Sequence, residues 1–346
     1  MVYVILALVS AMLFGLASPV AKPLLGSIGP LQLAGLFYLG AAIGVAPLLV
    51  KTKGNKNAGA DAGNLTPSNI KRLAIALMSG GIAAPVCLLF GLKAASASSV
   101  SMWLSLEAIF TSLLASLLFR EHLGRLGWIA VMGATFAAIL LSVGEGVSGI
   151  AAGSFVAAAC FFWALDNNVT ALIDGISPAR ITLLKGIVAG TINFCVGFLI
   201  QPQTISISLI AAGLLVGAIC YGLSLTLYIM AAQGMGAARS QILFATSPFW
   251  GVVFSGLILH ETLSLVQLSA GIVLAGALTA LLRDAHSHDH SHEHMAHTHM
   301  HRHDDGHHNH THEGQPASLT HTHWHEHEPM SHAHPHWPDL HHRHDH

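Results

Sequence analysis

Charged side chains are scarce over most of this 346-residue chain. Residues 1–282 contain 12 lysines or arginines and 7 aspartates or glutamates, and only 2 of the chain's 26 histidines. So little charge excludes a soluble domain with an ordinary charged surface. It also excludes a basic surface for nucleic acid, so we expect no nucleic-acid partner.

Cysteines and catalytic motifs are scarce as well. The chain has 4 cysteines, all in apolar stretches and without paired spacing: Cys87, Cys160, Cys195 and Cys220. We expect buried thiols rather than disulfides or a metal cluster. No nucleotide-phosphate loop, nucleophile–base arrangement or pair of catalytic carboxylates stands out. The sequence therefore predicts a protein that is not an enzyme and that requires no cofactor.

What residues 1–282 do contain is a series of long apolar runs. About 20 mainly apolar residues cross a hydrocarbon core of about 30 Å. The polar and turn-forming residues between the runs divide them into ten predicted membrane-spanning helices. The sequence therefore predicts an all-α membrane protein, whose partner is the lipid bilayer. The predicted spans are roughly 2–21, 30–50, 72–91, 97–119, 126–143, 151–172, 178–200, 206–230, 237–259 and 264–282.

The placement of lysine and arginine predicts the orientation of these spans. With the N-terminus in the cytoplasm, eleven basic residues fall at inner loops and span ends, and only Lys22 and Lys93 fall outside. This bias follows the positive-inside rule. Because Val2–Ala21 lacks the basic start of a signal peptide, we expect a retained helix. The predicted location is a cell membrane (the inner membrane of a bacterium), with both termini cytoplasmic.

The two halves of the membrane part resemble each other. The segment 119–123 after span four matches 259–263 after span nine, 140 residues on. Near the N-terminus, 11–14 and 28–30 match 159–162 and 176–178, 148 residues on. Each copy has five spans, so the second enters the membrane upside down relative to the first, which is a transporter architecture. We expect repeats over 1–143 and 144–282 and a tail over 283–346.

The motifs in these repeats resemble the EamA-type transporters of the drug/metabolite transporter superfamily. They are Ala-Met-Leu-Phe-Gly at 11–15 with Pro19, the segments 101–111 and 117–123, Ser-Pro-Phe-Trp at 247–250, and His-Glu-Thr-Leu at 260–263. The resemblance covers residues 1–282 but not the tail. It implies two inverted five-helix bundles and the export of small solutes or ions, often coupled to protons.

Ionisable groups at membrane depth are candidates for function. Glu107 lies near the middle of span four, where burial disfavours the charged form, so it suits exchange between a cation and a proton. A packed, hydrogen-bonded carboxyl is the alternative. Asp166 and Lys185 reach the same depth when spans six and seven fold as a hairpin, so they form either a structural ion pair or, with Asn168, part of a cavity. Asn193 is a weaker cavity candidate.

In contrast to residues 1–282, which contain 2 histidines, the tail at residues 283–346 contains 24. Their His-x-His alternation places the imidazoles on one side of an extended chain, and imidazole is a common ligand of nickel, cobalt, zinc and copper. With almost no apolar residues, the tail is expected to be disordered without metal. An affinity tag is the alternative, but no run exceeds two histidines. The predicted ligands are His286, His288, His290, His292, His294, His297, His299, His301, His303, His321, His323, His325 and His327.

Together these features favour an exporter of a divalent metal, nickel or cobalt first and zinc next, with a cytosolic tail that captures the ion. The alternative is an exporter of a small metabolite or drug whose tail is only a metal sensor or buffer. The ligand of the protein is accordingly a metal ion or a small-molecule substrate. The oligomeric state stays open, with a homodimer as one option.

Overall fold

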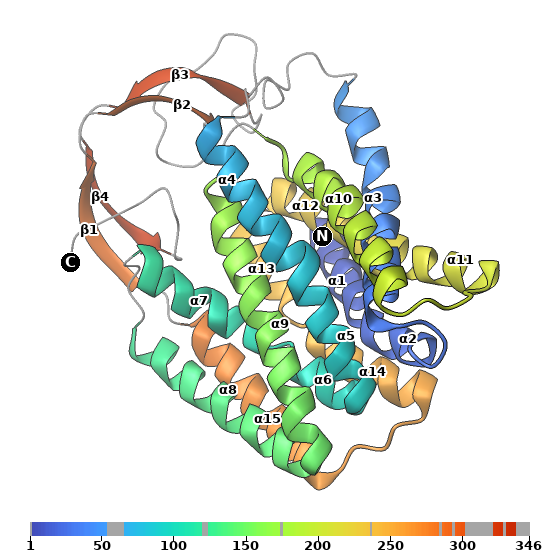
Figure 1. Cartoon of the computed structure of the whole chain (residues 1–346). Coiled ribbons are helices and arrows are strands. Elements are labelled where there is room, and N and C mark those ends of the chain that lie inside the picture. Colours follow the sequence, from blue (N-terminus) through green and yellow to red (C-terminus); the bar gives the residue numbers. More distant parts are fainter. Residues whose placement is uncertain are drawn as a thin grey trace.

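The computed structural model is a bundle of membrane-length helices followed by a tail with strands (Figure 1). The structure describes residues 2–53, 66–119, 124–173, 176–235 and 237–283, and the tail segments 286–292, 295–301, 321–327 and 330–336. Within these residues, nine apolar helices are long enough to cross a membrane, and Ser247–Leu259 is a shorter apolar helix. Joined to the helix before it, that segment forms the tenth span, which confirms the expected all-helical membrane fold.

The helices follow the two expected copies. The first contains α1 (Val2–Gly15), α2 (Ala17–Leu24), α3 (Pro30–Lys53), α4 (Pro67–Ala76), the π-helix η2 (Leu77–Ala83), α5 (Ala84–Ala94), α6 (Ala97–Trp103), α7 (Leu106–Phe119) and α8 (Arg125–Gly144). The second contains α9 (Val147–Ala171), α10 (Pro178–Ile200), α11 (Ile207–Val216), the π-helix η3 (Gly217–Leu223), α12 (Ser224–Met235), α13 (Ala237–Phe244), α14 (Ser247–Leu259) and α15 (Leu265–Leu282).

The element boundaries repeat with the two sequence offsets. α3 and α10 begin 148 residues apart, whereas α4, η2, α5 and α6 begin 140 residues before α11, η3, α12 and α13. The two π-helices therefore fall at the same place in spans three and eight. π-helical turns inside α-helices are rare and occur often at functional sites. Their recurrence shows that the duplication extends to an irregular feature of the backbone.

Spans one, four and nine are interrupted. The interruptions fall at Leu16, at 104–105 and at 245–246. Pro19 and Pro248 follow the first and third, and proline lacks the N–H that would bond to the carbonyl four residues earlier. Span four breaks without a proline, since Ala108 stands at the position that corresponds to Pro248. Interrupted spans near the membrane centre are common around transporter sites.

Glycines let the two copies approach closely. A Cβ atom at Gly217 in η3 would overlap the backbone carbonyl oxygen of Phe37 in α3, and one at Gly186 in α10 would meet the carbonyl of Tyr38. α3 of the first copy is thus packed between η3 and α10 of the second. Small residues at such crossings allow close backbone packing, which drives helix association in lipid.

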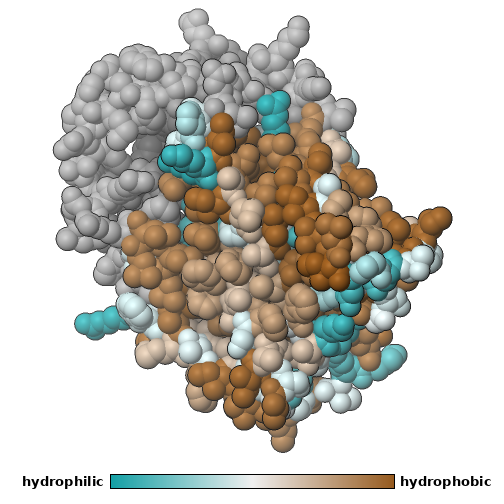
Figure 2. Space-filling view, in the orientation of Figure 1, coloured by the Kyte–Doolittle hydropathy of each residue, from teal (hydrophilic) through white to brown (hydrophobic). Residues whose placement is uncertain are grey.

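The outer surface of the bundle is apolar. On α8 the exposed side chains recur at helical spacing: Trp128, Met132, Phe136, Ile139 and Val143. Figure 2 shows apolar side chains in brown across the helical part of the face in view, with polar ones gathered toward its margins. A surface of this kind fits lipid tails rather than water.

The helices define two sides of the membrane part. We call the side where α15 ends the tail side; α4, α8 and α10 begin there, with Lys71, Arg72, Arg125 and Arg180. Arg72 donates a hydrogen bond of 2.6 Å to the carbonyl of Leu172, just beyond the end of α9. The opposite side holds the α5–α6, α8–α9 and α14–α15 connections.

In the tail, which we expected to be disordered without metal, the described backbone forms four strands. They are β1 (His286–His292), β2 (Met295–His301), β3 (His321–His327) and β4 (Met330–His336). β1 pairs with β4 and β2 with β3, both antiparallel. Pairing satisfies the backbone hydrogen bonds of extended segments that have no apolar core to enter.

Candidate functional site

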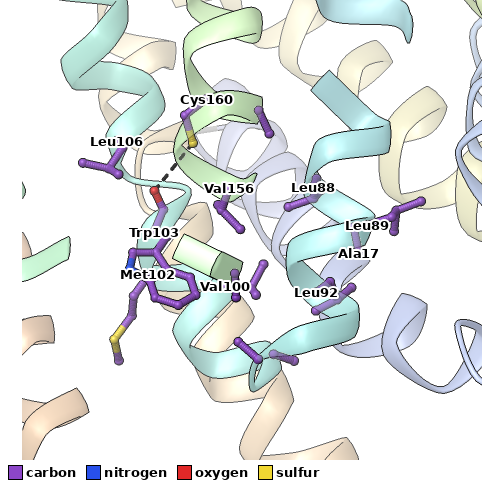
Figure 3. Packing of buried hydrophobic residues seen from close by; sticks show 14 of the residues in the cluster. Ala17, Leu88, Leu89, Leu92, Val100, Met102, Trp103, Leu106, Val156 and Cys160 are labelled. Atoms are coloured by element: carbon purple, nitrogen blue, oxygen red, sulfur yellow. Dashed lines mark hydrogen bonds between the residues drawn. The ribbon is translucent and has the colours of Figure 1, made fainter. Parts of the chain in front are cut away.

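Glu107 lies in the first turn of α7, directly after the break in span four. Its Oε1 accepts a hydrogen bond of 2.9 Å from the side-chain amide of Asn167 in α9. The start of a helix favours a negative charge, so the break supplies a favourable place for the carboxylate inside the bundle. Beside the break, the Cys160 thiol donates to the carbonyl of Trp103 at 3.6 Å (Figure 3).

Asp166 and Lys185 form a buried ion pair between α9 and α10. Their side chains are 10% and 13% exposed. Thr170 completes the group, since its hydroxyl donates to Asp166 at 2.9 Å and accepts from Lys185 at 3.2 Å. Of the two expected arrangements, the structure therefore contains the pair. Removing either residue would leave the other as an isolated buried charge, which is costly in a low dielectric.

The π-helix η2 adjoins this pair. The Asp166 carboxylate occupies the space that a Cβ atom at Gly80 would need. The carbonyl of Gly80 accepts hydrogen bonds from the Tyr38 hydroxyl and, at 3.1 Å, from the indole N–H of Trp163. A π-helical turn disturbs the regular backbone bonding, and here side chains from α3 and α9 satisfy the displaced carbonyl.

The two predicted asparagines connect helices through their amides. Asn193 in α10 is 1% exposed and donates to the carbonyl of Gly81 in η2 at 3.1 Å. Asn168 in α9 donates to the carbonyls of Thr111 at 3.2 Å and Ala164 at 2.8 Å. Both donors are thus engaged with backbone oxygen.

We call Glu107, Asp166, Asn167, Lys185, Tyr38, Trp163 and Gly80 the central polar cluster. Glu107 and Asp166 are close enough to interact electrostatically. The first copy lacks the charges of the ion pair, because Ser18 and Phe37 stand at the positions that correspond to Asp166 and Lys185 of the second copy. Hydropathy indicated Glu107, Asp166 and Lys185, whereas Tyr38 and Trp163 carried no signal beyond that of ordinary membrane aromatics.

The three span interruptions meet beside the cluster. A Cβ atom at Gly15 would contact the carbonyl oxygen of Ser247, and one at Gly251 would contact the hydroxyl of Ser101. In the described part of the chain, the buried hydroxyl oxygens of Ser101 and Ser105 have no hydrogen-bond partner. Helices α1, α6 and α14 therefore meet at backbone breaks, where a small rearrangement changes few regular hydrogen bonds.

On the opposite side, a carboxylate of the second copy holds the turn between α5 and α6 of the first. Glu261 accepts from the backbone N–H groups of Ala97 and Ser98, both at 2.9 Å, and from the Ser98 hydroxyl at 2.6 Å. It thus caps α6, a helix of the other copy, and not the helix that follows it. Lys22 donates to the carbonyls of Leu92 and Ala95 from the same turn.

A second carboxylate completes this arrangement. Glu145 accepts from the hydroxyls of Ser96 and Ser99, and Gln267 of α15 donates to the same two hydroxyls at 3.1 and 3.0 Å. We call these contacts, together with those of Glu261 and Lys22, the opposite-side clamp. It closes the two copies onto each other at one face of the membrane.

The described residues contain no group of three or more His, Cys, Asp or Glu that could hold a metal ion. Of the predicted histidine ligands, His294 and His303 lie outside the described residues. The other eleven lie in β1, β2 and β3, where the structure describes the backbone and its register.

Inverted five-span copies, interrupted helices at their interface and a buried charged cluster define a multi-pass membrane transporter. The EamA-like transporter family matches residues 1–143 and 151–283, and the chain belongs to this family. An uncharacterized transporter of Methanothermobacter thermautotrophicus (strain Delta H) is 28% identical over 283 residues, which cover 75% of this chain and 80% of that protein.

A solved crystal structure shares the fold. The alignment has a TM-score of 0.56 at 16% identity, and it covers 80% of this chain and 94% of the other. At that identity the likeness concerns the fold alone.

Proposed function

We propose that this transporter exports a divalent metal cation, nickel or cobalt first and zinc next, by proton-coupled alternating access. The observation that carries the proposal is the tail: 24 histidines directly follow the last membrane helix. Imidazole suits all of these ions. A tail tethered beside the translocation path raises the local metal concentration, to the millimolar range for short flexible connections.

The basic residues support a cytoplasmic location for the tail. Lys71, Arg72, Arg125 and Arg180 begin helices on the tail side, whereas Lys22 and Lys93 end helices on the opposite side. By the positive-inside rule, the tail side faces the cytoplasm. The tail would then collect metal on the side from which an exporter takes its substrate.

Glu107 is the proposed exchange site. Its carboxylate would bind the cation when ionised and release it when protonated, because burial away from water favours the neutral acid. The Asn167 amide beside it can turn its carbonyl oxygen toward a cation. The Asp166–Lys185 pair is already neutralised, so Glu107 is the acid in the central polar cluster with a charge to offer.

The opposite-side clamp supports a cycle between two states. Glu261 and Gln267 of the second copy hold a turn of the first, so the outer side is closed in this state. Opening requires that the α6 backbone N–H groups exchange Glu261 for water or another acceptor. Entry of a proton from outside, protonation of Glu107 and release of the metal would follow that opening.

Transport into inside-out membrane vesicles tests the proposal. Nickel, cobalt, zinc and copper are supplied separately, and uptake by the full chain is compared with uptake after deletion of residues 286–346. The deletion variant is expected to keep metal flux and to require a higher metal concentration for half-maximal rate. Absence of flux for all four metals with the full chain overturns the proposal.

One observation favours the alternative of a small organic substrate. Tyr38 and Trp163 lie beside a neutralised ion pair, and aromatic rings with paired charges suit an organic solute better than a bare cation. Such an exporter would move no metal with or without residues 286–346, although its tail would still bind metal.

A further inference from the structure

The strand register of the tail places histidine opposite histidine. In the pair β1–β4 the facing residues include His286 with His336, His288 with His334 and His290 with His332. In the pair β2–β3 they include His297 with His325, His299 with His323 and His301 with His321. Residues that face each other in an antiparallel pair lie on the same face of the ribbon. Each ribbon thus has a row of three histidine pairs on one face.

Both ribbons belong to a single register. From His286 to Met295 the chain advances nine residues, and the partner moves back nine residues, from His336 to His327. The histidine spacing in the sequence has the matching property. Histidines occupy even positions in β1 and odd positions in β2, and the partner chain changes from odd in β3 to even in β4. The change from even to odd histidine positions between β1 and β2 is therefore matched by the change from odd to even positions between β3 and β4, so histidine faces histidine in both ribbons.

We propose that metal ions lock the tail into this β-ribbon, with two successive facing pairs supplying four imidazoles to one ion. Facing Cβ atoms in antiparallel strands lie about 5 Å apart. Alternate residues along a strand lie about 7 Å apart. Four imidazoles at the corners of such a rectangle can reach one ion at the roughly 2.0–2.1 Å typical of zinc and histidine nitrogen. Each ribbon, with three pairs, holds one complete site and one spare pair.

This inference deepens the proposed function, because it specifies how the tail would hold its metal, but it requires no transport. Two cysteine pairs in the full-length protein test the register. Ser291→Cys with Ser331→Cys joins residues that face each other. Ser287→Cys with Ser331→Cys displaces one partner by four residues, about 13 Å along the strand. Zinc is the probe, followed by mild oxidation.

Digestion with trypsin allows the new disulfide to be detected. Cleavage after Arg283, Arg302 and Arg343 places the two new cysteines in separate peptides, 284–302 and 303–343, which stay joined only by the new disulfide. The four native cysteines lie in neither peptide. We expect zinc-dependent joining for Ser291–Ser331 and not for Ser287–Ser331. Equal joining of both pairs, or joining that is independent of zinc, overturns the inference.

A second comparison tests the four-imidazole site. His286→Ala with His336→Ala removes one whole pair and leaves two successive pairs in the β1–β4 ribbon. His286→Ala with His332→Ala removes the same number of histidines but breaks two pairs. Half-maximal joining of Ser291–Ser331 should need at least about tenfold more zinc in the second variant, because a structural zinc site uses four ligands and the loss of an outer-shell partner alone costs about 10–100-fold in affinity. If both variants need the same zinc concentration for half-maximal joining, the four-imidazole site is wrong. Metal transport by either variant tests only the proposed function.

Discussion

Replacing Glu261 with glutamine should loosen the opposite side of the protein. Glu261 accepts three hydrogen bonds from the start of α6, two from backbone N–H groups and one from Ser98. Hydrogen bonds to a charged group contribute about 1.5–3 kcal/mol each. An amide keeps one acceptor and loses the charge. Because the site is partly exposed, we take about 2 kcal/mol, which corresponds to an increase of roughly thirtyfold in the open population.

The assay is the labelling rate of a cysteine introduced at Ser101, whose side chain is 1% exposed below the clamp. Reaction with a small thiol reagent should be about thirtyfold faster when Glu261→Gln is added. Ser206→Ala is the matched control. It removes the cap of α11 on the same side, costing about 1 kcal/mol, without a described contact to the other copy. An unchanged rate in the Glu261→Gln variant, or an equal acceleration in the control, would refute the role of the clamp.

Three further predictions concern the membrane core. Glu107→Gln should abolish proton-driven metal flux while leaving the thermal unfolding temperature in detergent within a few degrees of the parent value. Metal flux that stays coupled to protons in this variant would contradict the exchange role of Glu107. Lys185→Met should destabilise the protein by about 3–5 kcal/mol, because Asp166 is left as an unpaired buried charge, and adding Asp166→Asn should restore most of the loss in unfolding assays. Gly217→Ala should cost about 1–3 kcal/mol by overlap with a backbone carbonyl of α3. Gly276→Ala, with open space around it, should be neutral or stabilising by up to about 1 kcal/mol in the same assay.

The spans and the duplication could be predicted from the sequence because lipid imposes length and apolarity on every crossing. The Asp166–Lys185 contact was also accessible, since a short hairpin fixes the relative depth of two neighbouring helices. The break in span four was not, because Ala108 replaces the proline that explains the corresponding break in span nine. The break lies where α1, α6 and α14 meet, and those contacts join residues far apart in the sequence.

The surroundings of η2 show the same limit. No local pattern indicates that Tyr38 and Trp163 meet at the carbonyl of Gly80, since the three residues come from different helices and the irregular turn is set by tertiary packing. In the tail, composition predicted metal ligands but not strands. The self-complementary spacing of the histidines was visible in the sequence, but alternation along one strand says nothing about its partner until a register is known.

The most direct test of metal export is nickel accumulation in inside-out vesicles under an imposed proton gradient, with the vesicle interior acidic. Vesicles that contain the full chain should accumulate nickel above its equilibrium level. The accumulation should collapse when a protonophore is added, and vesicles that contain Glu107→Gln should show none. Nickel, cobalt and zinc levels that match those of protein-free vesicles, with the gradient intact, would contradict the account.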